Sequence, residues 1–156
     1  MAKVLIVDDE KDVADVLAEI CQLAGYETDW APTGEIGLRK LQLDEDIAVV
    51  LLDKNLPGMS GLDFIKRAKN DLKSYAQIVL VTGYPSLEAF KEAIKSGAYT
   101  CLKKPFDMNE VIRVVKDAHK HYERAKQSEQ VVVRDENKAL QESLERIRKT
   151  LEILKK

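Results

Sequence analysis

Five short apolar runs alternate with segments of helical period along most of the chain. The runs resemble buried strands, and they are Lys3–Val7, Tyr26–Ala31, Ile47–Asp53, Gln77–Val81 and Tyr99–Leu102. Apolar residues recur every three or four positions between them, which predicts helices. These helices are Lys11–Ala24, the segment from a Thr33 cap through Leu43, Leu62–Leu72, the segment from a Ser86 cap to Gly97, and an open-ended helix from Met108.

Strict alternation of strands and helices predicts right-handed crossovers and a parallel sheet with helices on both faces. The predicted fold class is therefore a doubly wound α/β domain. All strands of such a sheet end at the same edge, so the residues that end or follow them should lie close together. These residues are Asp8 with Asp9, Asp53, Thr82, and Lys103 with Lys104.

Asp53 ends the apolar start of V-V-L-L-D-K-N-L-P-G-M-S-G, residues 49–61. Three carboxylates at one edge repel one another unless a hard divalent cation neutralises them, and Mg²⁺ fits best because it also keeps positions for water and a phosphate oxygen. The pattern predicts that Asp53 attacks phosphorus as a nucleophile. Thr82 can donate a hydrogen bond to the phosphoryl group, and a lysine opposite can supply positive charge.

Each of these residues also has a plainer interpretation. Asp53 could begin a turn or cap the next helix, as acids at strand ends often do. Asp8 and Asp9 could form an N-cap pair that the helix dipole favours. Lys104 could be a solvated surface lysine.

Length and composition narrow the class of protein. A chain of 156 residues fits one domain with an appendage. A net charge of −2, with both signs spread along the chain, argues against a polyanion-binding surface. Cys21 and Cys101 lack metal-site spacing and are predicted to be small, buried apolar residues. Without a signal-peptide pattern or an apolar run near about 18 residues, the sequence predicts a cytoplasmic protein with no membrane segment.

Four motifs follow the first, third, fourth and fifth strands: D-D-E, D-K-N-L-P-G-M-S-G, V-T-G-Y and L-K-K-P-F. In this order they resemble the receiver domain of two-component response regulators, over about residues 1–121. The resemblance implies a flavodoxin-like, five-stranded sheet of order 2-1-3-4-5 with helices on both faces. It also implies a phosphoprotein in which Asp53 accepts a phosphoryl group from a phosphohistidine of a sensor histidine kinase.

The same resemblance implies roles for the site residues. Asp9, Asp53 and the backbone carbonyl of Asn55 would bind Mg²⁺, while Asp8 would act mainly through a metal-bound water. Thr82 would rotate toward a phosphoryl oxygen and Lys104 would pair with it, and the peptide bond from Lys104 to Pro105 would be cis.

The part of the chain that switches is expected between Thr82 and Phe106. It includes G-Y-P at 83–85 and a fourth helix whose predicted apolar face is Leu87, Phe90, Ala93 and Ile94.

Two residues depart from the family pattern. Receivers commonly carry an aromatic residue three positions before the phosphate-binding lysine, and Cys101 stands there instead. Tyr99 then either has no equivalent part, or the signal leaves mostly through Thr82 and the loop and helix after it. Lys54 also replaces the more usual apolar residue after Asp53, although a lysine stem can cover apolar surface.

Residues 122–156 differ from the rest of the chain. They lack Gly and Pro, and nine Lys or Arg against seven Asp or Glu give them a charge of +2, against −4 for the remainder (16 minus 20). Apolar residues follow a heptad pattern, with Asn137 at an a position, which favours an in-register parallel dimer. The d positions are Val133, Leu140, Ile147 and Leu154, and the other a positions are Leu144 and Leu151.

Two other interpretations of this segment are a single amphipathic helix packing on a domain outside this chain and a basic region for nucleic acid. The second is weaker because acids and bases mix evenly. The predicted organisation is therefore a receiver domain, 1–121, and a helical coiled-coil extension or linker, 122–156.

The stretch G-Y-P-S-L-E-A-F-K-E-A-I-K-S-G-A-Y, residues 83–99, resembles receivers of enhancer-binding transcription activators, in which a helical linker leads to an ATPase domain. This chain shows no ATPase or DNA-binding domain. A natural truncation, a receiver-plus-linker fragment and a regulator with a different enzyme as output all remain open.

The predicted function is a phosphorylation-dependent, dimerising signalling switch rather than an enzyme. An enzyme with a phospho-aspartate intermediate is one alternative, but a phosphatase of that kind needs a second acid where Asn55 stands. The other alternative is a degenerate receiver that serves as a constitutive coiled-coil scaffold. It is disfavoured because the full set of expected site residues is present: Asp8, Asp9, Asp53, Thr82 and Lys104.

Overall fold

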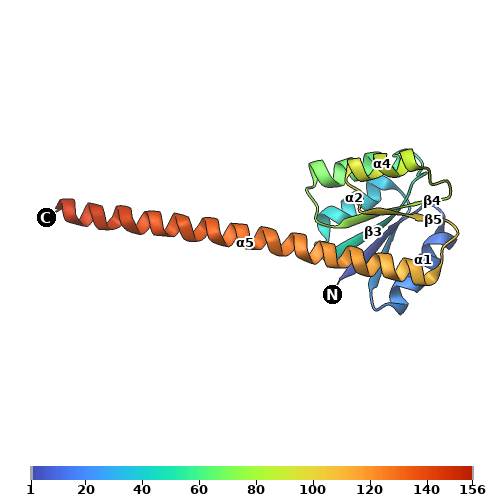
Figure 1. The fold of residues 1–156 in the computed structure, drawn as a ribbon, viewed down its shortest axis with the longest axis horizontal. Helices are drawn as coiled ribbons and strands as arrows, with labels where there is room; N and C mark the ends of the chain where they lie inside the picture. The colour runs from blue at the N-terminus through green and yellow to red at the C-terminus, as the bar shows by residue number, and fades with distance from the viewer. Residues whose placement is uncertain (1, 156) are drawn as a thin grey trace. The chain divides into compact units, whose positions relative to one another are not determined.

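A computed structural model describes residues 2–155, except for the side chains of 130–133 and 155. Strands and helices alternate as the hydrophobic pattern predicts (Figure 1). The elements are β1 (Lys3–Val7), α1 (Lys11–Leu23), β2 (Glu27–Ala31), α2 (Gly34–Leu43), β3 (Ile47–Asp53), α3 (Gly61–Lys66), η1 (Arg67–Asp71), β4 (Gln77–Thr82), α4 (Leu87–Ser96), β5 (Thr100–Lys103) and α5 (Met108–Lys155).

The sheet is parallel throughout and has the order β2-β1-β3-β4-β5. The predicted fold class is confirmed. β3 lies at the centre and is buried along its whole length, which explains its almost purely apolar sequence. This order places the carboxyl ends of β1, β3 and β4 next to one another, and Asp53 ends the middle strand of the three.

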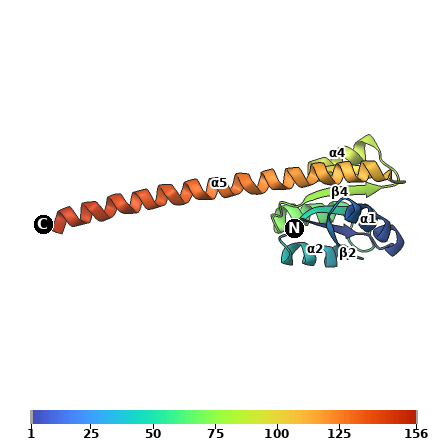
Figure 2. The same ribbon diagram turned by 90° about the horizontal axis from the view of Figure 1, so that it is seen from below.

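Two hydrophobic cores lie on the two faces of the sheet. On one face the strands pack against α1 and the first turns of α5 (Figure 1, Figure 2). On the other face they pack against α2, α3, η1 and α4, with Phe64 fully buried. Side chains that alternate along each strand supply the two cores, so β1 contributes Val4 and Ile6 to one and Leu5 and Val7 to the other.

The helix boundaries rest on local hydrogen bonds that the sequence predicts. Thr33 Oγ1 accepts a bond from the Ile36 N–H at 3.2 Å, and Ser86 Oγ accepts one from the Ala89 N–H at 3.1 Å. These are N-caps. Gly97 ends α4 with φ +115°, a left-handed conformation in which glycine avoids the strain of a side chain.

The predicted helix over Leu62–Leu72 is present over residues 61–71, but it is not α-helical throughout. The α-helix ends at Lys66 and continues as the π-helix η1, because the Leu72 N–H bonds to the Arg67 carbonyl, five residues earlier, at 3.0 Å. The predicted strand Tyr99–Leu102 is displaced by one residue, since Thr82 pairs with Lys103 and extends both β4 and β5. The predicted strand Tyr26–Ala31 begins one residue later.

The predicted apolar face of α4 is mostly exposed. Only Ala93 of its four residues is buried, while Leu87, Phe90 and Ile94 face solvent. The helix therefore buries only one small side chain completely. Apolar period alone did not reveal this, because it gives the direction of a face and not the depth to which it is buried.

Cys21 is buried as predicted, and burial raises the pKa of its thiol to about 12. The same prediction is wrong for Cys101, which is half-buried because it lies on β5, the edge strand of the sheet. Its pKa is raised by burial, an effect that the nearby charge of Lys54 partly offsets.

The chain divides into two units, 1–123 and 124–156. α5 begins in the first unit and forms the second. Val133 lies outside the described side chains. The other apolar heptad residues, Leu140, Leu144, Ile147, Leu151 and Leu154, are exposed within their unit. In the part of the chain that the structure describes, every helix lacks the combination of length and apolar character needed to cross a membrane.

Candidate functional site

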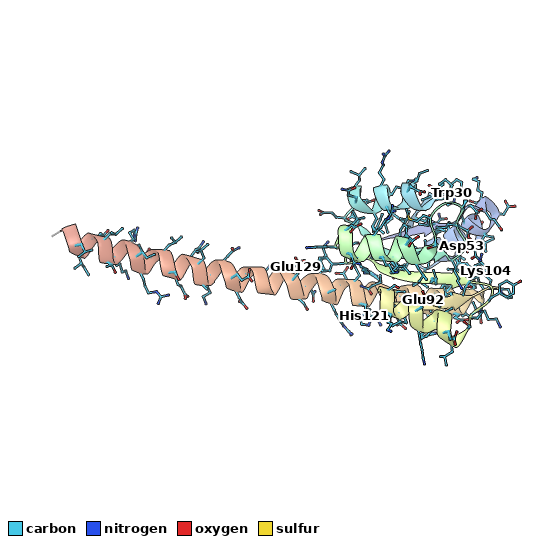
Figure 3. The ribbon with its side chains drawn as sticks, turned by 90° about the horizontal axis from the view of Figure 1, so that it is seen from above. Trp30, Asp53, Glu92, Lys104, His121 and Glu129 are labelled. Carbon is cyan, nitrogen blue, oxygen red and sulfur yellow. The ribbon has the colours of Figure 1, made fainter. Side chains whose placement is uncertain are left out.

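The predicted site residues come from the carboxyl ends of four strands. Asp8 and Asp9 follow β1, Asp53 is the last residue of β3, Thr82 is the last residue of β4, and Lys104 follows β5. Figure 3 places Asp53 and Lys104 at the same end of the sheet. The convergence that the parallel topology predicts is therefore present.

Three carboxylates form the acidic part of the site. One oxygen from each of Asp8, Asp9 and Asp53 lies within 4.8 Å of the others. Asp8 and Asp53 are only 2% and 8% exposed, whereas Asp9 is open to solvent. Such a cluster of hard oxygen ligands, two buried and one exposed, fits a divalent cation of the Mg²⁺ kind that retains water on its open side.

Burial governs the charge of Asp8. Loss of hydration raises the pKa of its carboxyl group, and the negative charges of Asp53 and Asp9 act in the same direction. The bond that Asp8 Oδ1 accepts from the Glu10 N–H at 2.9 Å opposes this rise, as does the charge of Lys104. A bound cation would relieve the repulsion that remains.

The N-cap interpretation of the acidic pair is wrong. Helix α1 begins at Lys11, so the cap position belongs to Glu10, and Asp8 bonds to the Glu10 N–H ahead of the helix. Neither acid of the pair occupies the cap, and their carboxylates lie with Asp53 instead.

Lys104 is directed into the site. Its Nζ lies 3.4 Å from Asp53 Oδ1, and the side chain is 29% exposed, so it is not a solvated surface lysine. Its backbone N–H donates to the Thr82 carbonyl at 2.9 Å and so continues the pairing of β4 with β5. The peptide bond from Lys104 to Pro105 is cis, as the resemblance implies.

Thr82 is buried at the end of β4, and its hydroxyl already has a local partner. Thr82 Oγ1 accepts a hydrogen bond from the Tyr84 N–H at 3.2 Å. A turn of the side chain toward Asp53 would therefore exchange this bond for another, and the loop that begins at Gly83 would lose a contact with β4.

The loop after Asp53 is held tightly against the sheet. The Lys54 N–H donates to the Val81 carbonyl at 3.0 Å, and the Gly61 N–H donates to the Lys54 carbonyl at 3.2 Å. The Asn55 N–H lies 3.4 Å from Asp53 Oδ1, the long contact of a weak turn. These bonds bring Asn55 beside the acidic cluster. Asp53 therefore begins a turn, as its plainer interpretation proposes, and also belongs to the cluster.

Sequence reasoning missed Trp30, which borders the site from β2. Its indole Nε1 donates to the Asp8 carbonyl at 2.8 Å. The Trp30 backbone is itself held, because Lys40 Nζ donates both to its carbonyl and to Asp29 Oδ1 at 2.8 Å. Hydropathy holds no signal for this contact, since a tryptophan in a half-buried strand is ordinary core.

A family model described as the response regulator receiver domain matches residues 4–116. Sporulation initiation phosphotransferase F of Bacillus subtilis is 35% identical over 114 residues, which cover 73% of this chain and 90% of that protein. Regulatory protein AtoC of Escherichia coli is 34% identical over 116 residues, 74% of this chain and 25% of that protein. The chain thus spans nearly all of one relative and a quarter of the other.

Solved structures of receiver domains also match this chain. The beryllofluoride-activated NtrC4 receiver domain dimer matches with a TM-score of 0.72 and 32% identity, over 78% of this chain and 99% of that one. The region that the family model matches lies within the first unit and includes the site residues described above.

Proposed function

The chain belongs to the response regulator receiver family, and from this membership we propose that Asp53 accepts a phosphoryl group from a sensor histidine kinase. Membership gives the chain a phosphorylation-dependent role in two-component signalling, and the proposal adds the acceptor and the donor. The observation that carries it is the position of Asp53, an almost buried carboxylate between two other acids and Lys104 Nζ at 3.4 Å.

In the proposed reaction an Asp53 carboxylate oxygen attacks the phosphorus of a phosphohistidine. The bond from phosphorus to the imidazole nitrogen breaks, its electron pair returns to the ring, and an acyl phosphate remains on Asp53. Lys104 pairs with a phosphoryl oxygen and Thr82 donates a hydrogen bond to another. Both side chains already lie at the edge where this group would form.

Mg²⁺ is the proposed cofactor, and Asp9, Asp53 and the Asn55 carbonyl are its proposed protein ligands, with Asp8 acting through water. When bound there, Mg²⁺ would neutralise charge on the carboxylates and the phosphoryl oxygens. The cluster of three carboxylate oxygens within 4.8 Å supports this assignment. Asp8 and Asp9 contribute by holding the positive charge of the ion at the end of β1, beside Asp53.

Intact mass spectrometry after incubation with a small phosphodonor tests the acceptor. The chain should gain one phosphoryl group in the presence of Mg²⁺ and none in the presence of a chelator. Asp53→Asn should abolish the gain, whereas Asp63→Asn, which changes an exposed acid on the next helix, should leave it intact. Modification that survives in Asp53→Asn would contradict the proposal, as would a parent chain that gains nothing.

We propose that the signal leaves through Thr82 toward α4 and β5. When Thr82 turns to the phosphoryl group it gives up the Tyr84 N–H, so the loop before α4 becomes free to move. The bonds from Thr82 and Lys104 to phosphoryl oxygens exist only in the phosphorylated state, where the Lys104 bond replaces its pairing with Asp53 Oδ1. A hundredfold shift between two states needs about 2.7 kcal/mol. Cys101 stands where receivers commonly carry the aromatic residue of the switch. The loop after Thr82 therefore carries most of the signal in this proposal.

The exposed apolar side of α4 supports an output surface there. Leu87, Phe90 and Ile94 are partly exposed to solvent on a helix whose one fully buried side chain is Ala93. A helix with so little buried surface can shift at low cost. Together with β5 and α5 it forms the part of the unit where a change at Thr82 would be read.

We further propose that residues 1–121 act as the receiver and that 122–156 form a parallel homodimer through the heptad seam. The exposed Leu and Ile residues at successive a and d positions support this, because a lone helix gains nothing from such a stripe. The NtrC4 receiver domain, to which this chain is similar, is a dimer by its description.

Sedimentation equilibrium of the full chain tests the seam. Leu144→Glu with Ile147→Glu, at a and d, should give a monomer. The matched control is Ala139→Glu with Ile153→Glu, which adds the same charges at outward c positions and also removes an exposed isoleucine. Dimers that persist in the first pair, or dissociate equally in both, would contradict the seam. Repeating the measurement with phosphodonor shows whether the dimer depends on Asp53.

With a kinase as partner, the reaction takes place in the cytoplasm, as the sequence predicts. We propose that the chain has no enzymatic turnover of its own. We also propose that it makes no direct contact with nucleic acid, because the acids and bases of 122–156 mix evenly. The output surface proposed on α4 then acts on another domain or protein.

A further inference from the structure

We infer that Trp30 is a positioning residue for the metal site, acting through its indole N–H on the Asp8 carbonyl. The inference rests on the proposed function, in which Asp8 and Asp9 bind Mg²⁺ directly or through water. It concerns a residue of β2 that makes none of the proposed metal contacts itself.

The Asp8 backbone is fastened to the end of β2 at two points. Its N–H donates to the Ala31 carbonyl at 3.1 Å, which extends the pairing of β1 with β2 by one residue. Its carbonyl accepts the bond from Trp30 Nε1 at 2.8 Å. The second bond lies beyond the regular ladder, at the point where the chain leaves the sheet and the acids begin.

A bond to the Asp8 carbonyl also controls Asp9. The peptide unit is planar, so fixing the direction of the Asp8 carbonyl fixes the Asp9 N–H and the course of the chain into Asp9. Asp9 is exposed, and its carboxylate therefore depends on the backbone for its position. Trp30 holds that backbone so that Asp9 stays within 4.8 Å of Asp8 and Asp53 before any ion binds.

Trp30 is well placed to do this because it is itself immobilised. The backbone N–H of Trp30 donates to Asp29 Oδ1 at 2.8 Å. Lys40 Nζ of α2 donates both to that carboxylate and to the Trp30 carbonyl, each at 2.8 Å. The ring packs at the edge of the core shared with α1. Figure 3 shows Trp30 at the same end of the sheet as Asp53 and Lys104.

The experiment measures Mg²⁺ affinity by isothermal titration calorimetry of the full chain. Trp30→Phe keeps an aromatic ring and removes the donor, and it should weaken Mg²⁺ binding about tenfold, as loss of partners that orient metal ligands does. Replacing Trp30 with 3-benzothienylalanine, which keeps the bicyclic shape without the N–H, should weaken it equally. Incorporation of 5-fluorotryptophan retains the N–H and should preserve the parent affinity.

Tyr26→Phe is the matched control for stability. It also removes one O–H from an aromatic residue, but just before β2 begins, where Tyr26 Oη lies 3.0 Å from His119 Nδ1. If Trp30 only stabilises the fold, Trp30→Phe and Tyr26→Phe will both lower the unfolding midpoint and leave Mg²⁺ affinity unchanged, which overturns the inference. A benzothienyl variant that binds Mg²⁺ as tightly as the parent would overturn it too, because the indole N–H would then have no part in binding.

Two further readouts separate this inference from the proposed function. Trp30 is the single tryptophan of the chain, so Mg²⁺ should change the emission of the parent through the loop it holds. At saturating Mg²⁺, Trp30→Phe should still reach the parent extent of Asp53 phosphorylation. A parent that neither binds Mg²⁺ nor is phosphorylated contradicts the proposed function, whereas normal parent behaviour with an unchanged Trp30→Phe affinity contradicts only the role of Trp30.

Discussion

Gly61 lies where α3 begins, directly against the backbone that follows Asp53. A Cβ at this position would lie 2.9 Å from Leu80 Cδ1 and 3.2 Å from the Lys54 Cα. The first neighbour can turn aside, but the second is backbone held by its bond to Val81. Gly61→Ala should therefore destabilise the fold by about 1–3 kcal/mol, measured by urea unfolding.

Gly83 provides the comparison for this substitution. It follows Thr82, and a Cβ there would meet nothing within 4 Å. Gly83→Ala should change stability by less than about 0.5 kcal/mol. Equal losses in the two variants would show that the close approach at Gly61 is not the cause.

Lys3 and Asp44 form an ion pair that joins the start of β1 to the turn before β3, with Lys3 Nζ 2.6 Å from Asp44 Oδ2. The bond from Lys3 lowers the pKa of Asp44 below its ordinary value of 3.8 and raises the pKa of Lys3 above 10.5. The contribution of Asp44 is thus fully present above pH 3.8 and is lost as the pH falls through the lower folded value. The contribution of Lys3 is present below pH 10.5 and is lost above it.

Asp44→Asn should therefore lower the free energy of unfolding at neutral pH and leave less difference from the parent in acid. Asn keeps an oxygen for the Asp46 N–H, which Asp44 Oδ1 accepts at 3.0 Å, so the turn itself is preserved. Urea unfolding of both chains across the acid range measures the difference. A gap between the two chains that stays constant into strong acid would contradict the pairing.

The charged residues of the site were predictable because topology alone brings strand ends together. Asp8, Asp9, Asp53 and Lys104 needed only the alternation of strands and helices and the rule that parallel strands end at one edge. The Trp30 contact was not predictable in this way. It depends on the direction of one indole ring across two strands, which no periodicity encodes.

At the scale of elements, α4 depends on its N-cap because few of its side chains are buried. Ser86 Oγ accepts from the Ala89 N–H at 3.1 Å, and Ala93 is its one buried residue. Ser86→Ala should cost about 1 kcal/mol of stability, whereas Ser86→Asp, which keeps a capping oxygen, should cost little. Urea unfolding measures both, and equal losses would show that the hydroxyl does not cap the helix.

Element boundaries were predictable where a side chain or a glycine sets them. Thr33, Ser86 and Gly97 each act at the predicted position. The break between α3 and η1 escaped prediction because it follows from a backbone bond, from the Leu72 N–H to the Arg67 carbonyl, and not from a residue type. The exposure of Leu87, Phe90 and Ile94 on α4 was also not predicted. It depends on which helices cover the outer strands, and no single residue type determines that.

At the scale of the molecule, the proposed dimer places Asn137 at an a position of a seam that is otherwise apolar. A buried Asn at such a position reduces stability and fixes the register and the number of strands. Asn137→Leu should therefore raise the thermal unfolding midpoint of the full-length dimer. It should also let species larger than the dimer form, because the constraint on strand number is removed.

Ala139→Leu tests whether that effect belongs to the seam. Ala139 lies at an outward c position two residues after Asn137, so the substitution adds apolar volume on the other side of the helix. Sedimentation equilibrium should show a simple dimer for Ala139→Leu and a mixture for Asn137→Leu. If both variants give the same mixture, added hydrophobicity alone explains the association, and Asn137 then has no part in choosing a parallel pair.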